Sequence, residues 1–159
     1  MNAPLITRAR SGDAEVLTQI AFAAKRSWGY PEAWIQRWSE SLTITERYVD
    51  EHALFIVWVG NAIAGFAAVE RTTIHSDGRI GFRLEHLWIR PAVTRRGLGT
   101  ALFAACENAA RSEGATILLI ESDPHAELFY QRMGAVAVGY RTADMDGVQR
   151  KLPQMEKRW

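Results

Sequence analysis

The sequence predicts an α+β fold with a central mixed sheet that is mostly antiparallel. Three features of the 159-residue chain carry this prediction. Apolar stretches separated by short turns fill much of the first half and indicate antiparallel hairpins. The stretch 80–89 then leads through a glycine-containing turn into an amphipathic helix and another strand, which is the order of a β-α-β unit. More strands close the chain, and we expect about six or seven strands and about four helices.

The elements expected before the β-α-β unit are short and are bounded by caps and turns. Ser11-Gly12-Asp13 suits the start of a helix that runs to about Arg26, and Pro31 suits the first turn of a second helix. Gly60-Asn61 is a hairpin turn between two apolar strands. The expected elements are a strand at Leu5–Arg8, helices at 11–26, from 31 and at 45–51, strands at 54–59 and 62–73, and a turn at 75–78.

The helix of the β-α-β unit opens at Leu98 and ends before Gly114. Its expected packing face has the spacing of an amphipathic helix and contains Leu98, Ala101, Leu102, Ala105 and Ala109. After it we expect a strand at 116–121, a compact helix at 125–133 stopped by Gly134, and strands at 136–140 and about 148–155. No linker or repeat divides the chain, so a single domain over residues 1–159 is predicted.

Composition narrows the class of protein. A formal charge of +1, with 48% apolar and 23% charged residues, is typical of a soluble globular domain and does not favour a nucleic-acid partner. The stretch 1–10 lacks the apolar segment of a signal peptide, and the longest apolar run, 62–69, cannot span a bilayer. We therefore expect a cytoplasmic protein with no membrane partner. The single cysteine, Cys106, is expected to be a buried thiol.

The turn 94–100, with the sequence Thr-Arg-Arg-Gly-Leu-Gly-Thr, has the chemistry of a phosphate-binding loop. It follows a strand and opens a helix, so backbone N–H groups can point at an anion at the positive end of that helix. The loop lacks both the G-x-G-x-x-G dinucleotide pattern and the lysine of a P-loop. Binding of a different nucleotide is therefore the weaker interpretation.

This turn and a second segment together resemble the GNAT superfamily, the Gcn5-related N-acetyltransferases. Gly97 and Gly99 match the two glycine positions of the family pattern Gln/Arg-x-x-Gly-x-Gly/Ala, and Thr94 stands where Gln or Arg is usual. The resemblance implies that this turn holds the pyrophosphate of acetyl-coenzyme A. The residues matched to that role are Arg95, Arg96, Gly97, Leu98, Gly99 and Thr100.

The second segment, 123–134, resembles the family element Asn-x-x-Ala-x-x-x-Tyr-x-x-x-Gly-Phe. Asp123 replaces the usual Asn, whereas Ala126 and Tyr130 keep their places. The resemblance implies that Asp123 and Ala126 contribute to coenzyme binding. It also implies that the backbone of Leu87, Trp88 and Ile89 contacts the pantetheine arm of the coenzyme, while their side chains belong to the core.

Acetyl transfer to an amine requires a base for the amine and an acid for the leaving thiolate. Glu85 is the candidate base, acting directly or through water. It lies on the strand that precedes the phosphate-binding turn, where alternating side chains place it on the same face as residues 83, 87 and 89. Tyr130 is the candidate acid, because a phenol with a pKa near 10 is well matched to a thiolate. The alternatives stay open: Glu85 as a water-facing carboxylate, and Tyr130 as a core residue on a helical stripe. His86 points to the opposite strand face and is expected to be a packed or a surface histidine.

The sequence indicates less about the acceptor substrate than about the coenzyme. Trp28, Tyr30 and Trp34 are the predicted substrate-binding residues, since an aromatic wall can hold a cationic amine or stack on an aromatic one. Trp34 and Trp38 lie one helical turn apart, so burial of a helix face is the alternative. The four histidines show no metal-ligand spacing, and no metal is expected.

The resulting hypothesis is an N-acetyltransferase that moves an acetyl group from acetyl-CoA directly to a primary amine in a ternary complex. The acceptor would be a small molecule or a peptide. The alternative is a catalytically weak acyl-CoA-binding sensor or interaction domain with the same fold. The resemblance is compatible with a homodimer, although the sequence identifies no interface.

Overall fold

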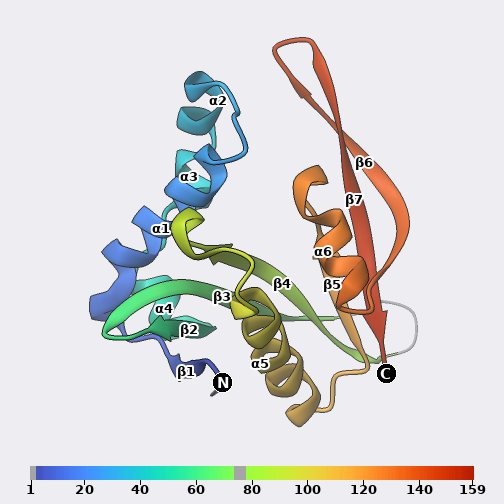
Figure 1. Cartoon of the computed structure of the whole chain (residues 1–159). Coiled ribbons are helices and arrows are strands. Elements are labelled where there is room, and N and C mark those ends of the chain that lie inside the picture. The colour runs from blue at the N-terminus through green and yellow to red at the C-terminus, as the bar shows by residue number, and fades with distance from the viewer. Residues whose placement is uncertain (1–2, 74–77) are drawn as a thin grey trace. The chain divides into compact units, whose positions relative to one another are not determined.

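The computed structural model describes residues 3–73 and 78–159 and has a seven-stranded mixed sheet with the strand order β1-β2-β3-β4-β5-β7-β6 (Figure 1). The chain divides into two compact units, each built from two sequence segments. The first contains Met1–Val69 and His86–Cys106, and the second contains Glu70–Glu85 and Glu107–Trp159.

The first unit begins with helices and an antiparallel ladder. β2 pairs with β1 on one side and with β3 on the other, both antiparallel. The elements are β1 (Leu5–Arg8), a 3₁₀ turn (Ser11–Asp13), α1 (Ala14–Arg26), α2 (Glu32–Arg37), α3 (Ser39–Leu42), α4 (Glu46–Glu51), β2 (Ala53–Val59), β3 (Ala62–Thr73), a 3₁₀ turn (Pro91–Val93) and the first turns of α5 (Leu98–Ser112). β3 and α5 continue into the second unit.

The core of the first unit forms because one face of α1 is apolar. Leu17, Ile20 and Ala21 recur at helical spacing and are fully buried. Alternate residues of the strands, such as Ile56, face the same core. The loop before α4 is tied to α1, since the Thr18 hydroxyl accepts a hydrogen bond from the backbone N–H of Ile44 at 2.9 Å. α1 ends at Arg26, and the backbone N–H of Ser27 caps it by donating to the carbonyls of Ala23 and Ala24.

The second unit contains the parallel connection. Gly81–Leu84 of β4 pair in parallel with Ile117–Ile120 of β5, and β4 runs on past these pairs to Ile89. β5 then pairs antiparallel with β7, and β7 with β6. The elements are β4 (Ile80–Ile89), whose residues from His86 on belong to the first unit, β5 (Ile117–Glu121), a 3₁₀ turn (Pro124–Ala126), α6 (Glu127–Arg132), β6 (Val136–Met145) and β7 (Val148–Arg158). β6 and β7 form the long hairpin seen in Figure 1.

The predicted fold class is confirmed, with one parallel connection in an otherwise antiparallel set of pairings where the register is given. The structure has six α-helices within the described residues, because 31–42 splits into two short helices at Trp38. The last two strands are longer than expected. The predicted turn at 75–78 lies largely outside the described residues, which resume at Gly78.

The predicted packing face of α5 is partly wrong. Leu98 and Leu102 are buried as expected, but Ala101, Ala105 and Ala109 are only half-buried. The other fully buried side chains are Phe103, Cys106 and Ala110. The face is rotated because the largest apolar residue, Phe103, turns toward the core and the small alanines flank it. Burial of Cys106, which raises the pKa of its thiol to about 12, agrees with the expected structural role.

No helix within the described part of the chain combines the length and the apolar character needed to cross a bilayer.

Candidate functional site

The turn before α5 has a backbone shape that suits an anion. Arg95 and Gly97 both have positive φ, 63° and 77°, and α5 begins directly afterwards at Leu98. Left-handed residues in such a turn point successive N–H groups to one side, which makes an anion-binding concavity. The first hydrogen bond at this end of the helix runs from the N–H of Ala101 to the carbonyl of Gly97. The N–H groups before Ala101 have no acceptor within the helix.

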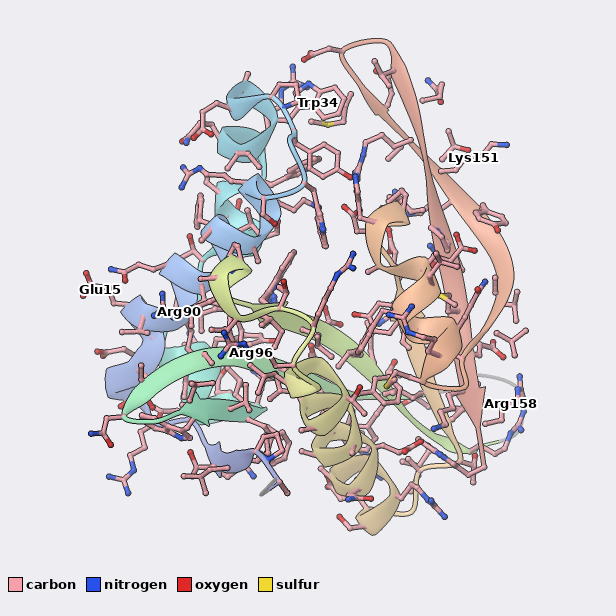
Figure 2. The ribbon with its side chains drawn as sticks, viewed as in Figure 1. Glu15, Trp34, Arg90, Arg96, Lys151 and Arg158 are labelled. Carbon is pink, nitrogen blue, oxygen red and sulfur yellow. The ribbon has the colours of Figure 1, made fainter. Side chains whose placement is uncertain are left out.

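The backbone of this turn is open at Gly97. A β-carbon added at Gly97 would meet no atom within 4 Å, so the backbone is open to a ligand. Arg95 and Arg96 are exposed, and Figure 2 labels Arg96 in the turn that precedes α5. The hydroxyl of Thr94 donates to the carbonyl of Pro91 at 3.3 Å, which engages this side chain within the turn. The donors for an anion are therefore mainly backbone groups and two arginines.

The end of β4 is anchored to β3 just before this turn. The backbone N–H of Arg90 donates to the carbonyl of Ala64 at 2.8 Å. The side-chain Nε of Arg90 donates to the carbonyl of Ile63 at 2.7 Å. The pairing of β3 with β2 is irregular here, because Val57 of β2 pairs with Gly65 whereas the next residue, Trp58, pairs with Ile63. Ala64 is therefore an extra residue, a β-bulge. The bulge was missed by sequence reasoning, although an isolated glycine inside an apolar strand is a signal for one.

Leu87, Trp88 and Ile89 are half-buried at this strand end. The Trp88 side chain packs against the core of the first unit, and its indole Nε1 donates to Nδ1 of His86 at 3.0 Å. The ring of His86 also contacts Tyr48 and Phe66, each with a centroid separation of 5.8 Å. Burial lowers the pKa of His86 to about 4, so the ring is neutral. Of the two expectations for His86, the packed histidine is confirmed.

The predicted acceptor-wall residues lie in one aromatic cluster of the first unit. Trp28 is 5.8 Å from Trp88, and Tyr30 is 6.0 Å from Trp34 and 5.1 Å from Trp38, measured between ring centroids. Figure 2 labels Trp34 at α2. The structure thus brings Trp28, Tyr30 and Trp34 together with two further tryptophans.

A lysine stands among these rings and was missed by sequence reasoning. Nζ of Lys25, in the last turn of α1, lies 4.3 Å from the ring centroid of Trp38 and 5.1 Å from that of Tyr30. It also lies 5.6 Å from Trp28 and 6.0 Å from Trp88. Four aromatic rings therefore surround one ammonium group at cation–π distances. The signal in the sequence was a basic residue one helical turn before an aromatic stretch.

The candidate base and acid both belong to the second unit. The Glu85 side chain is about one-third exposed, and its Oε1 lies 3.5 Å from Nε of Arg83, in agreement with the predicted shared strand face. Tyr130 is buried, 7% exposed, and its ring packs edge-on against Phe129 at 5.2 Å. Its backbone carbonyl accepts from Met133 and Ala135 and so ends α6. Both the catalytic interpretation and the core interpretation of Tyr130 fit this position.

The carboxylate of Asp123 is already engaged by protein groups. It accepts from the backbone N–H and from Nδ1 of His125, both at 2.9 Å, and caps the 3₁₀ turn that ends at Ala126. It also forms an ion pair at 3.1 Å with Arg150, and both side chains are less than 10% exposed. Sequence reasoning missed Arg150. A coenzyme contact by Asp123 therefore has to involve its backbone or displace these partners.

The first unit carries an anion-binding turn, an anchored strand end and an aromatic cluster, and the second carries a carboxylate and a phenol. Within residues 3–73 and 78–159, no group of three or more His, Cys, Asp or Glu side chains is placed to hold a metal ion.

Comparison with known proteins shows an acetyltransferase family. The family model of the acetyltransferase (GNAT) domain matches residues 14–157. No match is found among curated proteins.

Several solved structures share the fold. A GCN5-related N-acetyltransferase from Rhodopseudomonas palustris is 23% identical, with a TM-score of 0.77 over 100% of this chain and 98% of the other. The PaiA N-acetyltransferase of Thermoplasma acidophilum, in complex with coenzyme A, is 18% identical, with a TM-score of 0.72 over 99% and 100%. YncA of Salmonella typhimurium, with its cofactor acetyl-CoA, is 17% identical, with a TM-score of 0.71 over 99% and 94%.

These likenesses show a shared fold, and the family model covers most of the chain. The glycine turn that opens α5 and the segment that contains Tyr130 both fall inside the matched residues. The chain belongs to the GNAT family of acetyltransferases.

Proposed function

We propose that this protein transfers an acetyl group from acetyl-CoA to a primary amine, directly and within a ternary complex. The observation that carries the proposal is the turn before α5, where two residues of positive φ meet the N-terminus of a fifteen-residue helix. The complexes of PaiA with coenzyme A and of YncA with acetyl-CoA, proteins of the same fold, support this choice of donor.

In this proposal the turn before α5 and the end of β4 bind the coenzyme. Backbone N–H groups from Gly97 to Thr100 would bind the pyrophosphate, and the positive end of α5 would favour its charge. Arg95 and Arg96 add positive charge beside it, and both are exposed. The backbone of Leu87–Ile89 would bind the pantetheine arm, and a backbone N–H there would polarise the thioester carbonyl.

Glu85 is the proposed base for the acceptor amine. An alkylammonium with a pKa near 10.4 is almost wholly protonated at neutral pH, so transfer needs a proton acceptor or a pocket that lowers the pKa of the amine. The Glu85 carboxylate is about one-third exposed, which allows water to carry the proton to it. Arg83, its neighbour on the same strand face, cannot serve as a base because a guanidinium stays charged.

Tyr130 is the proposed acid for the leaving thiolate. A phenol and a thiol have similar affinities for a proton, so transfer between them is nearly balanced. Burial of Tyr130 and its packing against Phe129 hold the ring in one orientation. Asp123 and Ala126 would contribute to coenzyme binding through the backbone of the 3₁₀ turn before α6.

We favour direct transfer over a mechanism with an acyl-enzyme intermediate. Cys106, the one cysteine of the sequence, is fully buried and burial raises the pKa of its thiol to about 12. A buried, protonated thiol is a poor nucleophile. The amine therefore attacks the thioester itself in this proposal.

We propose one domain over residues 1–159, supported by a family model that spans 14–157. A cytoplasmic location and a homodimer stay predictions.

The experiment compares binding with turnover. Thermal unfolding is measured with acetyl-CoA, CoA or ATP, and thiol release is then followed over a panel of amines. Stabilisation by both coenzyme forms but not by ATP, with amine-dependent thiol release, is the expected result. Stabilisation without release from any amine would favour the alternative of an acyl-CoA sensor. No stabilisation by acetyl-CoA or CoA would contradict the role of the turn before α5.

A further inference from the structure

We propose that His86 is a positioning residue for the acceptor amine. It holds the indole of Trp88, and Trp88 in turn holds Trp28, a residue of the predicted acceptor wall. All three residues belong to the first unit. This role rests on the proposed function and adds to it a residue that acts without touching the substrate.

The ring of His86 is held between two elements of the first unit. Tyr48 of α4 packs edge-on against it, and Phe66 of β3 packs against it at a tilt, each with ring centroids 5.8 Å apart. Phe66 is fully buried, so the ring of His86 rests on the closely packed core. Nδ1 of His86 therefore has a defined position.

The hydrogen bond between Trp88 and His86 has one direction. An indole nitrogen only donates, so Nδ1 of His86 must be unprotonated to accept from Nε1 of Trp88 at 3.0 Å. Burial lowers the pKa of His86 to about 4, and the ring therefore keeps this acceptor at neutral pH. The ring proton then lies on Nε2.

This bond selects one orientation of the Trp88 ring. His86 and Trp88 lie two residues apart on β4, so their side chains share a face of the strand. The backbone of Trp88 is itself fixed, because its carbonyl oxygen lies against Gly65. The outer torsion of a tryptophan side chain has broad, roughly two-fold wells, and half a turn about it moves Nε1 to the other side. Only one of these positions lets Nε1 reach Nδ1 of His86.

Trp28 is packed against the ring that His86 orients. The ring centroids of Trp28 and Trp88 are 5.8 Å apart and their planes are tilted by 47°, which is a close aromatic contact. Trp28 lies in the turn after α1, and Gly29 continues this turn with a φ of 81°. Trp28 is half-buried, so part of its surface is exposed. A rotation of the Trp88 ring would therefore move the surface that Trp28 offers to an acceptor.

The kinetic test uses phenethylamine, whose ammonium and ring suit both ways in which an aromatic wall binds an amine. We expect His86→Leu to raise KM for this amine about 10-fold. We expect kcat and the affinity for acetyl-CoA to change by less than about 2-fold. His86→Asn retains an acceptor near the place of Nδ1 and should keep KM near the wild-type value. In Trp88→Phe, which lacks the donor, His86→Leu should cause no further rise.

Trp58→Phe is the matched control. The indole Nε1 of Trp58 donates to the Thr7 hydroxyl at 2.8 Å, so this variant also removes one indole hydrogen bond from the first unit. We expect it to lower the stability in urea without changing KM for phenethylamine. An equal rise of KM in Trp58→Phe, or a full additional effect of His86→Leu in the Trp88→Phe background, would overturn the proposal.

A spectroscopic test separates the positioning role from the proposed function. The six tryptophans are replaced by fluorotryptophan, and the fluorine resonance of Trp28 is assigned with Trp28→Phe. We expect this resonance to respond to phenethylamine in the wild type and to shift or broaden in His86→Leu. It should stay in place in His86→Asn and Trp58→Phe.

The outcomes of the two tests are distinct. The expected fluorine results without thiol release would support the positioning role of His86 and contradict acetyl transfer to this amine. A Trp28 resonance that does not move in His86→Leu, or that does not respond to phenethylamine in the wild type, would overturn the positioning role whatever the turnover.

Discussion

Gly65 lies against the backbone of Trp88 so closely that a β-carbon at Gly65 would be 2.6 Å from the Trp88 carbonyl oxygen and 3.2 Å from Cα of Ile89. This close approach joins the bulge of β3 to the end of β4. The strand end proposed to bind the pantetheine arm is thus held by a neighbour from another part of the sequence.

Gly65→Ala is expected to destabilise the fold by about 1–3 kcal/mol, since the added methyl must displace backbone in a packed core. Equilibrium unfolding in urea measures the change. The control is Gly139→Ala in β6, where a β-carbon would meet no atom within 4 Å. Equal stability changes in the two variants would contradict the account of the close approach.

Gly97→Ala is expected to weaken acetyl-CoA binding about 10-fold or more, because an L side chain strains a backbone with φ of 77° and distorts the anion-binding turn. Calorimetric titration with acetyl-CoA measures the affinity. Gly147→Ala is a matched control, because its φ is 83° and its added β-carbon would also meet open space. A comparable loss of acetyl-CoA affinity in Gly147→Ala would show that backbone strain at any position weakens binding, and would contradict a specific role of the turn before α5.

His86 is expected to make the fold less stable in acid. The pKa of its ring is about 4 in the folded protein, against an ordinary value of 6.5. The unfolded chain therefore binds more protons between these values, and stability falls as the pH drops from 6.5 to about 4 and then levels off. The loss from this group is at most about 3 kcal/mol, at about 1.4 kcal/mol per pKa unit.

Urea unfolding at a series of pH values measures this loss. His86→Gln keeps an acceptor for the Trp88 indole but does not titrate, so its stability should vary less over this window. His125→Gln is the control, since the His125 ring is 43% exposed. Unchanged pH dependence in His86→Gln would refute the assignment.

Tyr130→Phe is expected to lower kcat by about 10²–10⁴-fold while acetyl-CoA affinity stays nearly constant. The loss should be largest at low pH, where the thiolate most needs a proton. Steady-state kinetics over pH measure the effect. Tyr140→Phe is the control, because that hydroxyl is exposed and donates to Glu127 at 3.1 Å. Wild-type turnover by Tyr130→Phe across the pH range would remove Tyr130 from the mechanism.

Local signals in the sequence were enough to predict the class of fold and the place of the glycine turn before α5. Both depend on local signals: period-two and helical apolar patterns, and glycines where φ is positive. Gly97 begins the turn into α5 as expected, and Gly60 and Gly134 also have positive φ at expected ends of elements. The alternation of the strand placed His86 on the face opposite Glu85, but only the packing made its ring buried and neutral.

Only the tertiary structure decided which side chains meet. Asp123 pairs with Arg150, Lys25 meets the ring of Trp88, and Gly65 meets Trp88 across a bulge. These contacts join residues that are 23–63 positions apart, by their numbers in the sequence. A local pattern specifies the face on which a side chain lies, but close packing of distant segments selects its partner.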